Sequence, residues 1–368
     1  MRVAPARLRE RSTKPVAITF GIIGAGGIAN KLHLPQIAAM PGARVKSIAG
    51  RKESRLRILA DRWQIPHWTH DWREVLSDPD IDAVIVALPH PLHVPAGVAV
   101  LQARKHLLMQ KPLCDTMEDA HRFVEAADAA ARHGVVTLAM PHFAPAIYAV
   151  RDELGRNSIG RVSGASARSS HGGPEVYYAE VRDSFEETGD DLWFFDANQA
   201  SVGALFDMGV YATSQLVAVG GSVARVFGRT ATLDKATRLE DTATLLLEFE
   251  SGALGTMETG WCDPARTNFL HVHGTRGKLQ APGHGGNALT RWTPGSYTRE
   301  DIPATPEAVD VAPFAHGNVH EHFVACIDGK TQPPVSNARF ARHVTEVLLA
   351  GLSSANSGMP VTLETRVD

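Results

Sequence analysis

Phe20-Gly21-Ile22-Ile23-Gly24-Ala25-Gly26-Gly27-Ile28-Ala29 is the stretch that decides the fold of this chain. The residues that lead into the glycines, Val16 to Ile23, are apolar or small, which is typical of a parallel strand buried on both faces. Gly24, Gly26 and Ala29 have the spacing G-x-G-x-x-A. In this pattern the first glycine allows a tight turn, the second lets a pyrophosphate reach the backbone, and the third small residue lets helix and strand pack closely.

The residues around the glycines fit a β-α-β unit. Ile28 to Met40 has helical spacing, Pro41-Gly42 ends it, and Ala43 to Ala49 has the pattern of a second strand. We expect the amides of Gly27 and Ile28 to face an anion, with the positive end of the helix dipole behind them. A glycine-rich turn can also serve only to reverse the chain, so it is this context that favours a dinucleotide site.

Strand and helix patterns alternate through the first part of the chain. Apolar runs that suit buried strands occur at 81–88, 106–109 and 135–139, and helical patterns separate them. We therefore predict an α/β domain with a doubly wound parallel sheet, a Rossmann domain, over residues 16–140. Residues 1–15 are basic and are expected to form a flexible arm.

The pattern changes after Pro141, where longer strand patterns follow one another, with helical patterns at 147–154 and 210–219. They occupy 162–170, 223–232, 241–250, 253–261 and 269–274. We predict an α+β domain over residues 141–368 with a large, mostly antiparallel sheet, in which Ser251-Gly252 forms a hairpin turn. Residues 281–318 are rich in Gly, Pro and Thr and are expected to run over the surface. Two closing helices follow, and we expect them to pack back on the first domain.

Composition excludes several classes of protein. The 368 residues are 44% hydrophobic and 21% charged with a formal net charge of -3, so there is no global reason to expect nucleic acid or an anionic membrane as a partner. No apolar run approaches the length of a membrane span. The three cysteines are far apart and odd in number, which favours a reducing compartment, the cytoplasm, and argues against disulfides or a thiolate metal site.

Several separated motifs resemble the Gfo/Idh/MocA family of oxidoreductases, and the resemblance extends from Val16 to Leu363. The motifs are Gly24-x-Gly26-x-x-Ala29, Asp82 to Ala87 with Pro89 and His93, Lys111-Pro112, Phe143-x-Pro145, Gly203 to Tyr211, and Ser353 to Gly358. The resemblance implies a Rossmann domain followed by an open-faced α/β domain. It also implies hydride exchange between a nicotinamide and a carbinol carbon, usually of a sugar, polyol or related compound. We expect a homodimer or homotetramer formed through the second sheet.

The chain departs from the family pattern at four positions. Gln110 replaces the usual glutamate before Lys-Pro, and Leu88 replaces a small or hydroxyl residue. Pro141 stands where a polar residue is common, and Ser214 where an acid or amide is frequent. These changes leave the predicted fold intact and bear on the substrate and on some cofactor contacts.

Three residues are candidates for catalysis. Lys111 follows the strand at 106–109, at the edge where open α/β sheets bind ligands. A lysine there could equally be a surface residue, and the resemblance favours the catalytic role. Asp207 and Tyr211 are four residues apart, so they share a face if Asp207 begins the helix; the alternative is a capping aspartate and a packed aromatic residue. Our hypothesis is that Tyr211 exchanges the hydroxyl proton while Lys111 favours its deprotonated form and polarises the substrate oxygen, with Asp207 orienting the group. Lys111 could itself be the base.

Cofactor choice depends on the end of the second strand. NAD sites usually have an acid there, whereas this chain has Gly50, Arg51 and Lys52. Two cations attract a 2′-phosphate, so we predict NADP in preference to NAD, although both charges could simply be solvated. Further cofactor contacts follow from the resemblance: Leu88, Pro89, His93, Gln110 and Lys111.

Substrate contacts are the least specific prediction. We name His142, Arg168, His171 and Trp193, and we expect no metal because the histidine clusters lie in different elements without a carboxylate pattern. Two other functions remain open. One is a regulator that binds the dinucleotide without turnover, and the other is redox-assisted glycoside cleavage on the same fold. Retention of the three candidate catalytic residues favours the enzyme.

Overall fold

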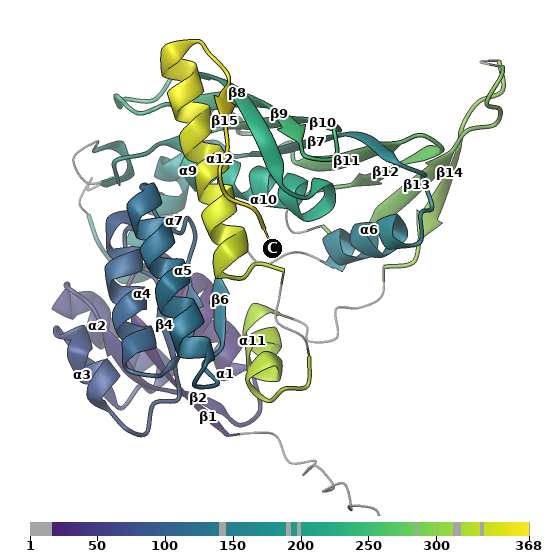
Figure 1. Ribbon diagram of the computed structural model, residues 1–368. Helices are drawn as coiled ribbons and strands as arrows, with labels where there is room; N and C mark the ends of the chain where they lie inside the picture. Colours follow the sequence, from purple (N-terminus) through teal and green to yellow (C-terminus); the bar gives the residue numbers. More distant parts are fainter. Residues whose placement is uncertain are drawn as a thin grey trace, which may run out of the picture.

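The computed structural model describes residues 17–139, 145–188, 193–196, 200–283, 286–299, 301–311, 318–331 and 335–367 (Figure 1). These residues form a parallel sheet with flanking helices and a larger, mostly antiparallel sheet, so the predicted fold class is confirmed. The basic arm lies outside the described residues. In the described part of the chain, no helix has both the length and the apolar character needed to cross a membrane.

The first sheet has six strands, all parallel, in the order β3-β2-β1-β4-β5-β6. Its strands are β1 Ile18–Ile23, β2 Ala43–Ala49, β3 His67–Thr69, β4 Ala83–Val86, β5 His106–Met109 and β6 Thr137–Ala139. β1 is buried along its whole length, as its apolar sequence predicts. The strand order reverses between β1 and β4, and in open α/β sheets ligands bind beyond the carboxyl ends of the strands at such a point.

Helices cover both faces of this sheet. They are a π-helical turn Ala29–His33, α1 Leu34–Ala38, α2 Glu53–Trp63, α3 Trp72–Ser77, a 3-10 turn His90–Leu92, α4 His93–Gln102 and α5 Met117–Ala131. The helix predicted from Ile28 to Met40 is therefore present, and it changes from a π-helical turn to an α-helix at Leu34. Pro35 lies at the start of α1, where its missing N–H removes a donor from the helical ladder.

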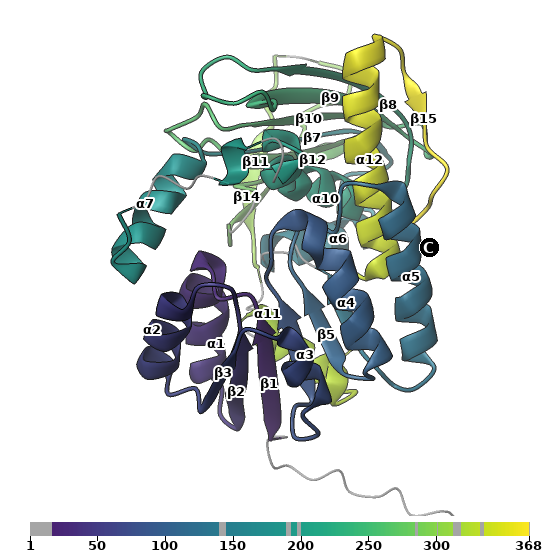
Figure 2. The ribbon, with the colours of Figure 1, turned by 90° about the vertical axis from the view of Figure 1, so that its left-hand side faces the viewer.

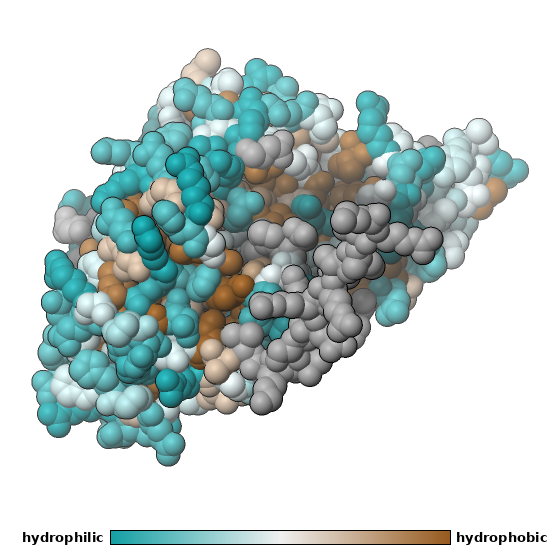
Figure 3. All heavy atoms as spheres, turned by 60° about the horizontal axis from the view of Figure 1, so that its bottom comes forward, coloured by the Kyte–Doolittle hydropathy of each residue, from teal (hydrophilic) through white to brown (hydrophobic). Residues whose placement is uncertain are grey.

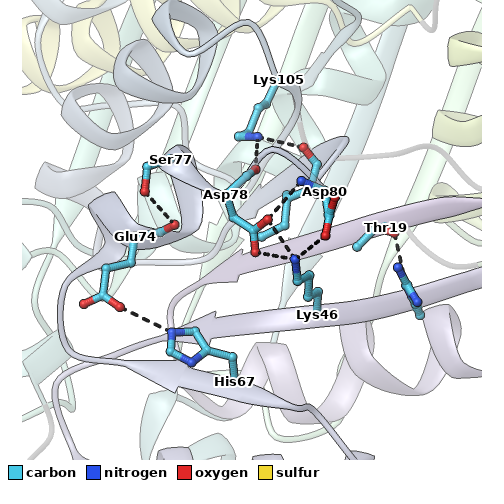
Figure 4. Close-up of polar contacts among 10 residues, drawn as sticks. Thr19, Lys46, His67, Glu74, Ser77, Asp78, Asp80 and Lys105 are labelled. Atoms are coloured by element: carbon cyan, nitrogen blue, oxygen red, sulfur yellow. Dashed lines mark hydrogen bonds and ion pairs between the residues drawn. The ribbon is translucent and has the colours of Figure 1, made fainter.

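The amino ends of the parallel strands are held by a polar cluster (Figure 4). Lys46 Nζ lies 2.8 Å from carboxylate oxygens of both Asp78 and Asp80, and Lys105 Nζ donates to the carbonyls of Asp78 and Ile81 at 2.7 Å. These contacts provide hydrogen-bond and ion-pair partners for the loop that precedes β4. This loop lies at the edge of the sheet opposite the glycine-rich turn. We therefore interpret this cluster as structural.

The second sheet has nine strands in the order β14-β13-β12-β11-β7-β10-β9-β8-β15. Its strands are β7 Val162–Ser170, β8 Val223–Ala231, β9 Thr242–Phe249, β10 Leu254–Gly260, β11 Phe269–Gly274, β12 Gly277–Ala281, β13 Leu289–Thr293, β14 Thr305–Val309 and β15 Val361–Thr362. All pairs are antiparallel except β7 with β10. The turn at Ser251-Gly252 joins β9 to β10 as predicted, with φ +81° at Gly252.

One face of the second sheet is covered by α6 Pro145–Gly155, α9 Ala204–Asp207, α10 Gly209–Gly220 and α12 Ala338–Ser357. The same half of the chain also contains α7 Pro174–Phe185, a 3-10 turn Trp193–Phe195 and α11 Val319–Ile327. α10 packs beneath the centre of the sheet, and α12 runs along β8 and then beside α5 of the first domain (Figures 1 and 2). Val319 and Phe323 of α11 join the buried cluster around β1. On the open face of the sheet, Leu246 and Leu254 are exposed.

The prediction that residues 281–318 only run over the surface is wrong in part. Residues 281–318 contribute β13 and β14, which extend the sheet beyond β12. These strands lie at the edge, where pairing with a neighbour rather than a run of apolar residues defines the element. The helix α7 was also not predicted. Viewed from below, hydrophilic residues dominate the first domain's outer surface and hydrophobic residues gather toward the middle of the molecule (Figure 3).

Candidate active site

An ion pair joins the two domains at the end of β5. Lys111 Nζ lies 2.9 Å from Asp207 Oδ1 and donates to the Asp207 carbonyl at 2.6 Å. Both side chains are buried, with 14% of the lysine and 10% of the aspartate side chain exposed. The structure therefore brings together two of the three predicted catalytic residues from positions 96 residues apart.

Asp207 has two further donors. Its Oδ2 accepts from Trp261 Nε1 at 2.9 Å and lies 3.4 Å from His171 Nε2. The backbone N–H of Gly173 donates to His171 Nδ1 at 2.8 Å, so the ring proton is on Nε2, facing the carboxylate. Glu240 holds the start of α9, because its Oε1 accepts from the first amides of this helix. The orientation of Asp207 is therefore fixed from several sides.

Electrostatics keep this pair ionised. Burial would raise the pKa of Asp207, but the adjacent Lys111 cation and the His171 N–H outweigh it and hold that pKa well below its usual range. Burial would likewise lower the pKa of Lys111, and Asp207 together with Tyr211 reverses the effect so that the pKa is raised above 10.5. At neutral pH the site therefore presents a lysine cation.

Tyr211 lies beside this cation. Lys111 Nζ is 4.8 Å from the centre of the Tyr211 ring, within cation–π range. The expectation that Asp207 begins the helix that carries Tyr211 is wrong: Asp207 ends α9, Met208 separates the helices, and Tyr211 lies in the first turn of α10. A Cβ on Gly209 would come within 3.1 Å of Leu205 and Thr259 side-chain atoms, which explains a glycine in this helix.

The glycine-rich turn has the shape that a dinucleotide requires. Gly24 has φ +122°, and a Cβ there would lie 2.1 Å from the Ala87 carbonyl oxygen, so only glycine fits. Gly26, by contrast, has open space where its Cβ would be. Gly27 faces Tyr177 and Val181 of α7. Backbone accessible at Gly26, at the point where the strand order reverses, fits a pyrophosphate.

Gly50, Arg51 and Lys52 lie at the end of β2, as predicted. A Cβ on Gly50 would lie 2.7 Å from Ala25 Cβ, so Gly50 keeps this strand close to the glycine turn. Arg51 is exposed, and Lys52 precedes the first residue of α2. Glu53, the nearest acid in sequence, accepts from Arg57 at 2.6 and 2.9 Å.

His93, one of the residues predicted to contact the cofactor, is buried beside the loops that follow β4 and β5. The ring nitrogens of His93 lie 2.6 Å from the Pro112 carbonyl and 2.7 Å from the Leu88 carbonyl. Burial lowers the pKa of His93, although these two carbonyls oppose the shift. His93 thus braces the loops after β4 and β5, in which Leu88 and Pro89 are half-buried.

Gln110 belongs to a buried chain of hydrogen bonds. Its Oε1 accepts the Lys111 N–H at 3.0 Å, and its Nε2 lies 3.2 Å from His33 Nε2. His33 Nδ1 is 2.8 Å from His320 Nε2, and His320 Nδ1 is 2.8 Å from Gln36 Oε1. Burial lowers the pKa of His33 to about 3. This chain connects α11 to the backbone of Lys111.

Only some of the residues predicted to contact the substrate lie at the candidate site. His171 lies at the site, and Trp193 packs edge-on against His90 with ring centres 5.2 Å apart. The structure does not bring Arg168 to the site: Ala167 faces the core, so Arg168 lies on the other face of β7, paired with Glu258 at 2.8 Å. His142 lies outside the described residues.

Sequence reasoning did not find Trp261, Glu240 or His90, because no local motif marks them. Trp261 is fully buried within the sheet domain, and its contact with Asp207 depends on tertiary packing. Within the described ranges, no group of three or more His, Cys, Asp or Glu side chains is arranged to hold a metal ion.

Comparison with known proteins agrees with this geometry. Residues 18–138 match the oxidoreductase family model with an NAD-binding Rossmann fold, and residues 147–280 match the GFO/IDH/MocA C-terminal domain. The chain is 28% identical to 1,5-anhydro-D-fructose reductase of Ensifer adhaerens, over 85% of this chain and 89% of the relative. It is also 28% identical to D-xylose 1-dehydrogenase (NADP(+)) 2 of Haloferax volcanii, over 71% of this chain and 75% of the relative.

Among solved structures, aldose-aldose oxidoreductase from Caulobacter crescentus complexed with glycerol has the same fold. The TM-score is 0.77 at 20% identity, over 94% of this chain and 99% of that one. Two matched domains, a glycine turn shaped for a dinucleotide and homologues named as dehydrogenases and reductases lead to one conclusion: the chain belongs to the Gfo/Idh/MocA family of NAD(P)-dependent sugar and polyol oxidoreductases.

Proposed function

We propose that this chain transfers a hydride between NADP and a carbinol or carbonyl carbon of a sugar, polyol or similar hydroxy compound. The observation that carries the proposal is the buried Lys111–Asp207 pair beside Tyr211, at the carboxyl edge of the Rossmann sheet. When bound, the nicotinamide supplies the hydride chemistry. The protein's own groups then have to hold the substrate oxygen and move its proton.

The charges suggest a role for each residue. Lys111 is protonated at neutral pH because its pKa is raised, so we assign it to donate a hydrogen bond to the substrate oxygen rather than to act as the base. Tyr211, next to that cation, is assigned to exchange the hydroxyl proton. Asp207 fixes the lysine, and His171 and Trp261 fix Asp207.

The end of β2 supports NADP as the preferred cofactor. Arg51 is exposed and Lys52 stands at the start of α2, where the helix dipole adds to their attraction for a 2′-phosphate. Glu53 is engaged by Arg57. One relative carries NADP(+) in its name, which agrees with this choice.

The test is absorbance at the reduced-nicotinamide band with a panel of sugars and polyols. We expect turnover with at least one class, and kcat/KM for NADP at least about 10-fold above that for NAD, which corresponds to about 1.4 kcal/mol. Equal efficiency with both cofactors would contradict the preference. Tight cofactor binding without turnover of any substrate would favour the regulator, and cleavage of a glycoside without net cofactor change would favour the glycosidase.

We also propose that the open face of the second sheet forms a homodimer or homotetramer. Leu246 and Leu254 expose 54% and 64% of their surface on adjacent strands of this face. Light scattering should give a multiple of the 39.6 kDa chain mass, and Leu254→Glu should lower it. Leu233→Glu, at a 73% exposed position outside the sheet, is the matched control. A monomeric wild type, or equal effects of the two variants, would reject this interface.

A further inference from the structure

A carboxylate from the second domain reaches the end of β2. Glu187, two residues after α7, accepts from Arg55 Nε at 2.6 Å and from Arg55 Nη2. Its Oε2 also lies 3.4 Å from Lys52 Nζ. The side chains of Glu187 and Arg55 are each only 18% exposed, so this contact is not a loose surface pair.

Packing fixes the position of Glu187. Val181 and Phe185 of α7 are buried in the same cluster as Leu56 of α2, and the Arg55 guanidinium lies over the Phe185 ring at 5.0 Å. Figure 2 shows α7 reaching from the second domain toward α2. The carboxylate therefore stands beside the cations at the start of α2 as part of the domain contact.

This location matters for the cofactor. A dinucleotide whose pyrophosphate lies at the glycine turn places its adenosine ribose at the end of the second strand. There the cations are Arg51, Lys52, Arg55 and Arg57, while Arg57 already neutralises Glu53. Glu187 neutralises the charge of Arg55 and also lies close to Lys52. Of the two cations predicted to bind a 2′-phosphate, only Arg51 therefore attracts the phosphate without a nearby carboxylate that opposes it.

We propose that Glu187 is a specificity-determining residue: a carboxylate from the second domain that weakens binding of the 2′-phosphate of NADP relative to the free hydroxyl of NAD. The inference rests on the dinucleotide site of the proposed function, but it does not require NADP to be preferred. In many NAD sites the acid follows the second strand within the Rossmann domain itself. Here no acid stands directly at the end of β2, and the first that follows, Glu53, is paired with Arg57, while the second domain supplies a further carboxylate to the same region.

The experiment is fluorescence titration of the full-length protein with NADPH and with NADH. For Glu187→Gln we expect NADPH to bind about 3- to 10-fold tighter, because the substitution removes a negative charge a few ångströms from Lys52. NADH has no 2′-phosphate, so its Kd should change by less than about 2-fold. The gain for NADPH should shrink at high salt, since partly exposed charges are screened.

Two variants separate charge from packing. Glu180→Gln removes a carboxylate from the same helix, where it pairs with Lys31, and should leave the ratio of the two Kd values unchanged. Glu187→Asp keeps the charge with a shorter side chain, so its Kd ratio should stay close to that of wild type even if α7 packs less well. An equal change for NADPH and NADH in Glu187→Gln, or no change in either, would overturn the proposal. A wild type that prefers NADH would refute the NADP preference alone, because the ratio would still shift in Glu187→Gln.

Discussion

Lys111→Met is expected to lower kcat by about 10³-fold, because it removes the cation that we assign to the substrate oxygen. Methionine keeps an unbranched chain of similar length, so the change is mainly one of charge and hydrogen bonding. Steady-state kinetics with the best substrate of the panel measure the effect. Lys105→Met is the matched control: Lys105 precedes the same strand β5 at its other end, binds two backbone carbonyls, and should affect stability but leave kcat within about 3-fold.

The same substitution leaves the buried Asp207 carboxylate without its cation, and the loss of one partner of a buried ion pair typically costs about 3 kcal/mol or more of unfolding free energy. The double variant Lys111→Met/Asp207→Asn should recover much of this stability and none of the activity. Asp207 has a lowered pKa, so its contribution to stability is present above pH ~4 and is lost as the pH falls further. Lys111 has a raised pKa, so its contribution is present below about pH 10.5 and is lost above its folded pKa.

Denaturant unfolding should therefore show a stability difference between wild type and the double variant that is constant from about pH 5 to 9. Near-normal turnover in Lys111→Met, with or without a loss of stability, would remove the lysine from the chemistry. A loss of kcat in Lys105→Met as large as that in Lys111→Met would show that the effect is structural.

Tyr211→Phe is expected to lower kcat for substrate oxidation by about 10²-fold at neutral pH, because the proton-exchanging phenol is absent. The loss should become smaller as the pH rises, since hydroxide in the solvent can replace the missing base. A pH–rate profile from pH 6 to 10 records both effects. Tyr148→Phe, at a half-buried tyrosine on α6 beneath the other part of the sheet, should leave the profile unchanged.

The profile also distinguishes the two bases that the sequence left open. If Lys111 were the base, Tyr211→Phe would retain near-normal turnover, and the pH dependence of the wild type would persist in the variant. A loss that is the same at every pH would indicate that the hydroxyl only positions the substrate.

The sequence predicted those parts of the fold that are encoded locally. The glycine turn, β2, β5 and β7 follow from apolar runs and turn residues whose meaning does not depend on distant contacts. The edge strands β13 and β14 were missed because their polar residues form strands only by pairing with a neighbour. Helix α7 mixes apolar with charged residues, and its role depends on docking against α2.

In the candidate site, too, some features could be predicted from local sequence and others depend on distant contacts. Lys111 could be predicted from its place after a parallel strand, and Asp207 from its motif. Their 2.9 Å contact depends on how the domains meet. Arg168 was named as a substrate contact, but alternation along β7 turns its side chain to the opposite face of the sheet. Trp261, which follows the end of β10, donates a hydrogen bond to Asp207, and no sequence motif marks its position.

The hydrogen-bond chain that ends at Lys111 has a fixed polarity. A backbone amide can only donate, so the carbonyl oxygen of Gln110 must face Lys111 and its NH₂ group must face His33. Each imidazole then receives a hydrogen bond on Nε2 and donates from Nδ1, as far as the Gln36 oxygen. Neither ring can take up a proton without losing an accepted bond. The two histidines therefore hold the backbone of Gln110 and Lys111 in place, and they do not provide a path along which protons leave the site.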